Sequence, residues 1–252
     1  MTVIVGVRCS DGVVIGSDSL ATTAMGPQHL MALQSNNKIK IFENKVIVAS
    51  TGAVGFSQRL TEHVQQAITG GVFANNRREC ITNISRRLLS DFQNSLVQSR
   101  PGQGLGFGAL MAAVIQNIPC LVEYGTMDFQ PEVREGNLFF VSIGSGQMLA
   151  DPFLAFVSRV LWHGQMPDVE NAKFGVYWVL DHTIKYAPGG IGAPIKLAVL
   201  RRVDGNWKAE ELQDTQEAAE YIDELETHIA GFARQTIESA ESIALPSLPP
   251  AS

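Results

Sequence analysis

Metal-binding and nucleotide-binding motifs are absent from this sequence of 252 residues. The five histidines are scattered with no pair at metal-ligand spacing, and the three cysteines include no Cys-x-x-Cys pair. The GxxxxGKS/T loop that holds phosphate groups is also missing. We therefore expect no metal and no other cofactor, and we do not expect this chain to hydrolyse ATP itself.

Charged residues, long apolar runs and a leader sequence are equally scarce. Only 17% of the residues are charged, the net charge is −6 and there is no basic patch, which argues against a nucleic-acid partner. The longest apolar runs, such as residues 109–115, are too short to cross a bilayer, and the N-terminus lacks a signal-peptide pattern. With cysteines this sparse, we predict a cytoplasmic protein without a membrane partner. The low charge content also indicates surface buried between subunits.

Hydrophobic periodicity predicts strands interrupted by paired helices. Alternating apolar residues predict strands at 3–8, 12–17, 38–42, 45–51, 106–115, 119–125, 138–144, 194–201 and 207–212. A period of 3.6 residues predicts helices at 54–69, 80–97, 147–162 and 169–186, and we expect a polar loop at 21–37. Because the helices come in pairs, the pattern is not a parallel βαβ repeat. It predicts an α+β fold, a four-layer αββα sandwich of two stacked antiparallel sheets flanked by helix pairs.

The composition changes after Leu212, which divides the chain into a domain of residues 1–212 and an extension of residues 213–252. Residues 213–238 are rich in Glu, Ala and Gln and predict one helix, with apolar residues four and three apart. These are Ala218, Ile222, Leu225, Ile229 and Phe232. The helix either packs on its own domain or contacts a neighbouring subunit. The proline-containing end that follows is expected to be a flexible tail.

Threonine at position 2 is the first candidate for a reactive side chain. Because the residue after Met1 is small, we expect Met1 to be removed, which places a free α-amine on the same residue as the hydroxyl. Such an amine has a pKa of about 7.7–8.0, so part of it is neutral near neutral pH and can accept the hydroxyl proton. Many chains begin with Met-Thr for no catalytic reason, so other residues have to support this interpretation.

The segment from Thr2 to Thr22, which includes Asp18, resembles the start of a proteasome β-subunit and of its bacterial relative, the peptidase HslV. Both belong to the N-terminal-nucleophile hydrolases. The resemblance continues in register over residues 2–212 and is strongest to divergent bacterial homologues, the Anbu group or the beta-proteobacterial proteasome homologue. The family's other functional positions fall on Lys38, Gly52, Ser145 and Asp181.

The resemblance gives each of these positions a role. Lys38 would place a positive charge near the hydroxyl of Thr2, and Asp18 would pair with it. Ser145 and Asp181 would orient the α-amine, and the backbone N–H of Gly52 would stabilise the oxyanion. Each residue also has a structural alternative: a turn or strand-end aspartate, a surface lysine such as its neighbours, a serine in a turn, or a solvated aspartate on a helix.

The resemblance implies a threonine endopeptidase that hydrolyses peptide bonds inside a self-compartmentalised homo-oligomeric ring. Its substrates would be peptides or unfolded proteins, and its partner a separate ATP-dependent unfoldase. The substrate pocket would be lined by Ala21, Asn36, Lys40, Ser50 and Val54. That small, polar and partly basic set predicts tolerance of polar or acidic side chains. Two alternatives stay open: a hydrolase of the same class that acts on a small amide, and a catalytically silent ring or scaffold subunit.

Overall fold

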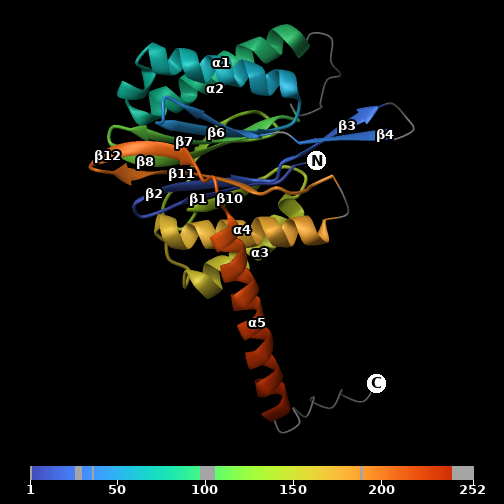
Figure 1. Ribbon diagram of the computed structural model, residues 1–252. Helices are drawn as coiled ribbons and strands as arrows, with labels where there is room; N and C mark the ends of the chain where they lie inside the picture. The colour runs from blue at the N-terminus through green and yellow to red at the C-terminus, as the bar shows by residue number, and fades with distance from the viewer. Residues whose placement is uncertain (1, 26–29, 36, 97–105, 188–189, 240–252) are drawn as a thin grey trace, which may run out of the picture.

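Two five-stranded sheets form the middle of the molecule (Figure 1). The computed structural model describes residues 2–25, 30–35, 37–96, 106–187 and 190–239. In spatial order, the first sheet contains β10 (Phe140–Ile143), β1 (Ile4–Arg8), β2 (Gly12–Ser17), β11 (Lys196–Val203) and β12 (Asn206–Glu211). The second sheet contains β5 (Ile39–Phe42), β6 (Val46–Thr51), β7 (Gly108–Ile115), β8 (Ile118–Tyr124) and β9 (Pro131–Val133). Neighbouring strands in both sheets are antiparallel.

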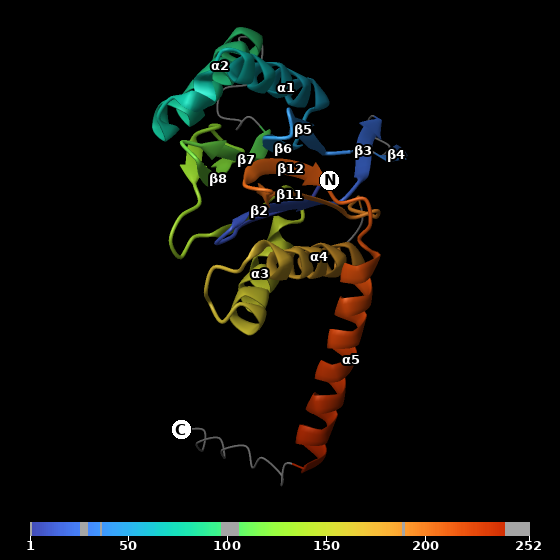
Figure 2. The same cartoon turned by 60° about the vertical axis from the view of Figure 1, so that its left-hand side comes forward.

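A pair of helices covers the outer face of each sheet and completes four layers (Figures 1 and 2). The second sheet is covered by α1 (Val54–Thr69) and α2 (Arg77–Leu96), with the short helix η2 (Val72–Ala74) between them. The first sheet is covered by α3 (Gln147–Leu161) and α4 (Val169–Tyr186). This arrangement confirms the predicted αββα sandwich.

The alternation of side chains along the central strands explains why the layers stack. Val5 and Val7 of β1 are buried against α3 and α4, whereas Ile4 of the same strand is buried between the two sheets. In β2, Val14 belongs to the helix-facing core and Ile15 to the core between the sheets. Burial on both faces explains why β1 and β2 carry apolar residues on both sides of the strand.

The prediction of a polar loop at residues 21–37 is wrong. The structure has a two-stranded antiparallel hairpin there, made of β3 (Leu20–Met25) and β4 (Leu30–Ser35), with Leu20 opposite Ser35 and Met25 opposite Leu30. The hairpin extends beyond the two main sheets (Figure 1). Adjacent threonines in β3 favour extended backbone, but the stretch lacks the strict apolar alternation that identified the other strands.

The predicted C-terminal helix is present as α5 (Gln216–Ser239) and leaves the body of the molecule (Figure 2). Ile222 is buried and Leu225 packs against the same core beside α4. Further along, Phe232 and Ile237 are 73% and 74% exposed. The expected flexible tail lies outside the described residues. None of the described helices combines the length and the apolar character that a bilayer span requires.

Candidate active site

The first sheet and the start of β5 bring four predicted site residues to one end of the sandwich. Thr2 lies just before β1, and Asp18 lies just after β2. Because these strands are antiparallel, with Ile4 opposite Ser17, the two residues are neighbours. Ser145 follows β10, whose residue Ile143 is also opposite Ile4, and Lys38 comes immediately before β5.

Asp18 is fully buried and connects the elements of this site. Its Oδ1 accepts hydrogen bonds from Lys38 Nζ at 2.5 Å and from the backbone N–H of Val3 at 2.9 Å. Its Oδ2 accepts the backbone N–H groups of Leu20 and Gly192, each at 3.2 Å. Four donors offset the cost of burying a carboxylate. One of these donors is the N–H of Val3, the residue after Thr2. The same oxygen of Asp18 therefore binds both Lys38 and the neighbour of the candidate nucleophile.

Lys38 is almost completely buried. Burial lowers the pKa of its ammonium group, because desolvation disfavours the charged form, and the hydrogen bond and charge of Asp18 oppose this effect. A lysine with a lowered pKa releases its proton more easily than a surface lysine does. The ion pair with Asp18 favours the charged form of Lys38, which can stabilise a developing negative charge, and the lowered pKa would help it take part in moving a proton.

A short loop between β10 and α3 contacts Thr2 through three consecutive residues. Ser145 Oγ lies 3.0 Å from Thr2 N and accepts its hydrogen bond, and the N–H of Gly146 donates to Thr2 O at 3.1 Å. Gly144 has a φ of +100°, and a Cβ atom there would lie 2.3 Å from Thr2 O. Only glycine fits at this position. With Met1 attached, Thr2 N is a peptide nitrogen, and its removal would turn the same atom into the amine that Ser145 contacts.

Gly52 follows β6, and Lys38 precedes β5. Because Ile39 is opposite Ala49, the two residues lie at the same end of these paired strands. Its φ is +106°, and a Cβ atom would lie 2.2 Å from Gly106 O. The chain therefore requires glycine here for steric reasons alone. The role of its N–H as oxyanion donor stays a prediction.

Three of the five predicted pocket residues lie where β5, β6 and α1 meet. Lys40 Nζ donates to Thr61 Oγ1 at 3.0 Å, and Ser50 Oγ donates to Ser57 Oγ at 2.8 Å. Val54 begins α1 and is 62% exposed. Of the other two, Ala21 is in β3 with a side chain outside the described part of the chain, and Asn36 lies outside the described residues.

The sequence did not point to Ser57 and Thr61 as neighbours of this pocket. They are four residues apart on α1 and therefore share one face of the helix. Thr61 also donates a hydrogen bond to the carbonyl of Ser57 at 2.8 Å. Only the packing of α1 against β5 and β6 shows that Ser57 and Thr61 lie here, because nothing in the local sequence distinguishes them from other polar helix residues.

Asp181 points to another part of the molecule. Its Oδ2 forms an ion pair with Lys185 Nζ at 2.7 Å, one helical turn further along α4. Thr183 of the same helix is fully buried, and its methyl group packs close to Gly146. Two residues correspond to roughly 200° around a helix, so Asp181 lies on the side of α4 that faces away from the loop around Thr2. The role of Asp181 in orienting the amine stays a prediction that this geometry does not support.

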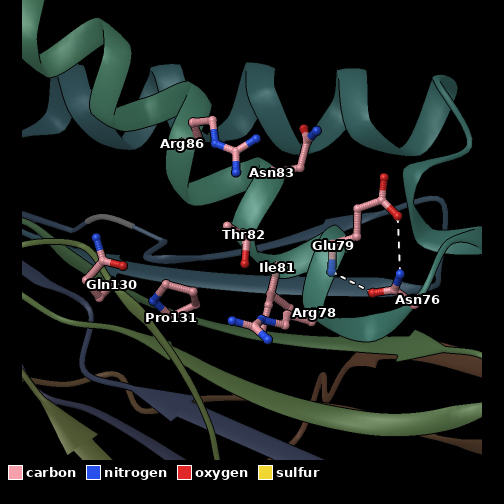
Figure 3. Close-up of a pocket in the computed structure, with 9 residues that line it drawn as sticks. All are labelled: Asn76, Arg78, Glu79, Ile81, Thr82, Asn83, Arg86, Gln130 and Pro131. Atoms are coloured by element: carbon pink, nitrogen blue, oxygen red, sulfur yellow. Dashed lines mark hydrogen bonds between the residues drawn. The ribbon is translucent and has the colours of Figure 1, made fainter.

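A polar hollow of about 700 Å³ lies between α2 and the start of β9 (Figure 3). Arg86, Thr82 and Gln130 are among the side chains that line it, and none of its residues belongs to the predicted site. We therefore assign it no part in the chemistry of Thr2. Among the described residues, no cluster of three or more His, Cys, Asp or Glu side chains could hold a metal ion.

The four-layer sandwich, with a threonine at the start of a central strand and a buried aspartate–lysine pair beside it, has the architecture of an N-terminal-nucleophile hydrolase. The family model for the proteasome subunit matches residues 2–155 of the chain. This protein therefore belongs to the proteasome subunit family, which confirms the resemblance seen in the sequence.

Solved structures of Anbu proteins share the fold over nearly the whole chain. A Gly-1 mutant of Anbu from Hyphomicrobium sp. strain MC1 is 16% identical with a TM-score of 0.70, covering 97% of this chain and 100% of that one. The Anbu complex from Pseudomonas aeruginosa, described as a helical assembly, is 16% identical with a TM-score of 0.69 and 99% of both chains covered. Anbu from Yersinia bercovieri, described as an ancestral β-subunit, is 14% identical with a TM-score of 0.68, covering 99% of this chain and 100% of that one. Comparison with curated proteins gives no match.

Proposed function

We propose that this protein is a threonine peptidase that uses Thr2, exposed by removal of Met1, as its nucleophile. The observation that carries the proposal is the fully buried carboxylate of Asp18, which binds Lys38 Nζ on one side and the N–H of Val3 on the other. A buried ion pair costs desolvation energy and stabilises a fold little. Its position beside Thr2 is better explained by chemistry than by stability.

The proposed reaction needs no metal ion. The neutral α-amine of Thr2 takes the proton of the hydroxyl, and Oγ attacks the carbonyl carbon of a peptide bond. The N–H of Gly52 stabilises the resulting oxyanion, the protonated amine gives its proton to the leaving amine, and the C–N bond breaks. Water then attacks the acyl-enzyme with the same amine as base, the bond between the acyl carbon and Oγ breaks, and the amine returns the proton to Oγ as the carboxylic acid product leaves. Ser145 keeps the amine in place through its hydroxyl.

We also propose that the chain works as a homo-oligomeric ring in the cytoplasm that encloses its active sites. Membership of the proteasome subunit family supports self-association. The exposed apolar side chains of α5 offer a surface for it. The substrates would be peptides or unfolded proteins, delivered by a separate ATP-dependent unfoldase.

The pocket contacts favour substrates with acidic or polar side chains before the cut. Lys40 is held by Thr61, and Ser50 by Ser57, so the wall formed by β5, β6 and α1 is polar and carries one cation. A peptide library should show cleavage after glutamate or glutamine at least as fast as after leucine. Lys40→Met should shift that preference roughly 10- to 100-fold towards leucine, since one charge-assisted contact is worth roughly 1.5–3 kcal/mol. A strict preference of the unchanged protein for bulky apolar residues would contradict this assignment.

Replacing the nucleophile tests the mechanism. We expect Thr2→Ala to fold and sediment like the unchanged protein and to lose peptide cleavage completely, whereas Thr2→Ser keeps a hydroxyl and retains part of it. A Thr2→Ala protein that cleaves peptides at the original rate would contradict the mechanism. If a small amide is hydrolysed and a broad peptide panel is not, the amidase alternative replaces the peptidase.

A further inference from the structure

Asp151 on α3 ties together both ends of the loop that contacts Thr2. Its Oδ1 accepts a hydrogen bond from the hydroxyl of Ser142 in β10, and its Oδ2 accepts one from the side-chain amide of Gln147 at 3.0 Å. Ser142 comes just before residues 143–146 and Gln147 just after them. A single carboxylate on α3 therefore binds both the strand that precedes the loop and the first residue of the helix that follows it.

The loop has little freedom to move without disturbing Thr2. Gly146 N–H and Ser145 Oγ both lie within hydrogen-bond distance of backbone atoms of Thr2. Gly144 is so close to Thr2 O that even a methyl group would collide with it. Errors of about 1 Å in the position of a catalytic group can cost about 100-fold in rate. What holds this loop therefore matters for the reaction.

Two features of the chain explain why a side chain is needed here. Ser142 is fully buried, so its hydroxyl depends on a protein acceptor, and Asp151 supplies one. Pro152, the next residue in α3, has no N–H and cannot donate to the carbonyl of Met148. The beginning of α3 thus lacks one backbone hydrogen bond just where it joins the loop. The hydrogen bonds of Asp151 join α3 to β10 and to its own first residue at this point.

We infer that Asp151 is a positioning residue for the Thr2 site, which acts by holding Ser145 and Gly146 against Thr2. The effect of Asp151 on the reaction rests on the proposed function of Thr2. The hydrogen bonds of Asp151 to Ser142 and Gln147 do not depend on that function. Asp151 does not touch Thr2, so its effect has to pass through the loop.

The test compares Asp151→Ala with the unchanged full-length protein by two measurements. Hydrogen exchange of the amides in residues 143–147, including Gly146 N–H, should become faster in Asp151→Ala. The rate of adduct formation with a peptide epoxyketone, which needs the amine and the hydroxyl of an N-terminal threonine, should fall about 10- to 100-fold. Asp151→Asn should recover part of both effects, because its side-chain oxygen still accepts the hydrogen bond from Ser142.

Asp168→Ala is the matched control. Asp168 caps α4, where its Oδ1 accepts the N–H of Asn171 at 2.8 Å, so its loss should cost stability without loosening the loop. The inference is overturned if Asp151→Ala leaves the exchange of the loop unchanged, or if it slows the adduct no more than the control does. If the unchanged protein never forms an adduct, the proposed function fails instead, and the exchange comparison alone decides whether Asp151 holds the loop.

Discussion

At the scale of single residues, Asp18 links chain segments that are far apart in the sequence. It binds the residue after Thr2, the lysine before β5, and Gly192 in the segment between α4 and β11. Leu20 also contributes to Asp18 through its backbone N–H, which does not depend on the side chain.

Breaking the pair between Asp18 and Lys38 should be costly. Lys38→Met keeps the length of the side chain but leaves the carboxylate of Asp18 buried without its cation. We expect the free energy of unfolding to fall by about 3–5 kcal/mol, measured by urea denaturation, and adduct formation at Thr2 to be lost. Lys196→Met is the control, since it breaks a more exposed ion pair with Glu211 and should cost less than about 1 kcal/mol. Equal losses in the two variants would show that the buried pair has no special role.

The structure brings together four of the site residues that the resemblance indicated and leaves Asp181 apart from them. Thr2, Asp18, Lys38 and Ser145 come together because each adjoins the end of a strand at the same edge of the sheets. Asp181 is inside a helix, where a difference of two residues reverses the direction of a side chain. Asp181 therefore lies on the opposite side of α4 from Thr183, whose methyl group packs close to Gly146.

At the scale of elements, the success of a prediction followed the burial of each segment. The limits of α1 and α4 agree with the predicted helices 54–69 and 169–186, because each has a continuous apolar side. The hairpin of β3 and β4 was mistaken for a loop, because a ribbon outside the main sheets has no core to impose an apolar pattern. The short strand β9 was missed for a related reason: three residues are too few for a period to show.

The exposed end of α5 should be required for assembly. Most of a helix's stability in a protein comes from the packing of its apolar face, and Phe232 and Ile237 of α5 have little contact with the rest of the chain. The double variant Phe232→Glu with Ile237→Glu should reduce the sedimentation coefficient at a fixed concentration. Met127→Glu changes a side chain that is also 71% exposed but follows β8, and it should not alter sedimentation. An unchanged coefficient for the double variant would remove α5 from the assembly surface.

At the scale of the whole molecule, the fold and the family support different parts of the account. The antiparallel pairing of β1 with β10 in the first sheet places the start of β1 beside the loop before α3, and that explains how Thr2 meets Ser145. The match to the proteasome subunit family assigns the chain to a known class of proteins. The reaction of Thr2 in this chain is the central claim to test.

The most direct measurement is the intact mass of the purified full chain, recorded with and without a peptide epoxyketone. The account predicts the loss of one methionine and the gain of one stoichiometric adduct, and it predicts that Thr2→Ala gains none. Loss of Met1 without an adduct would contradict a peptidase site open to peptides and favour the small-amide alternative. Retention of Met1 would contradict the mechanism itself, because Thr2 would have no free amine, and would leave a silent ring subunit as the better description.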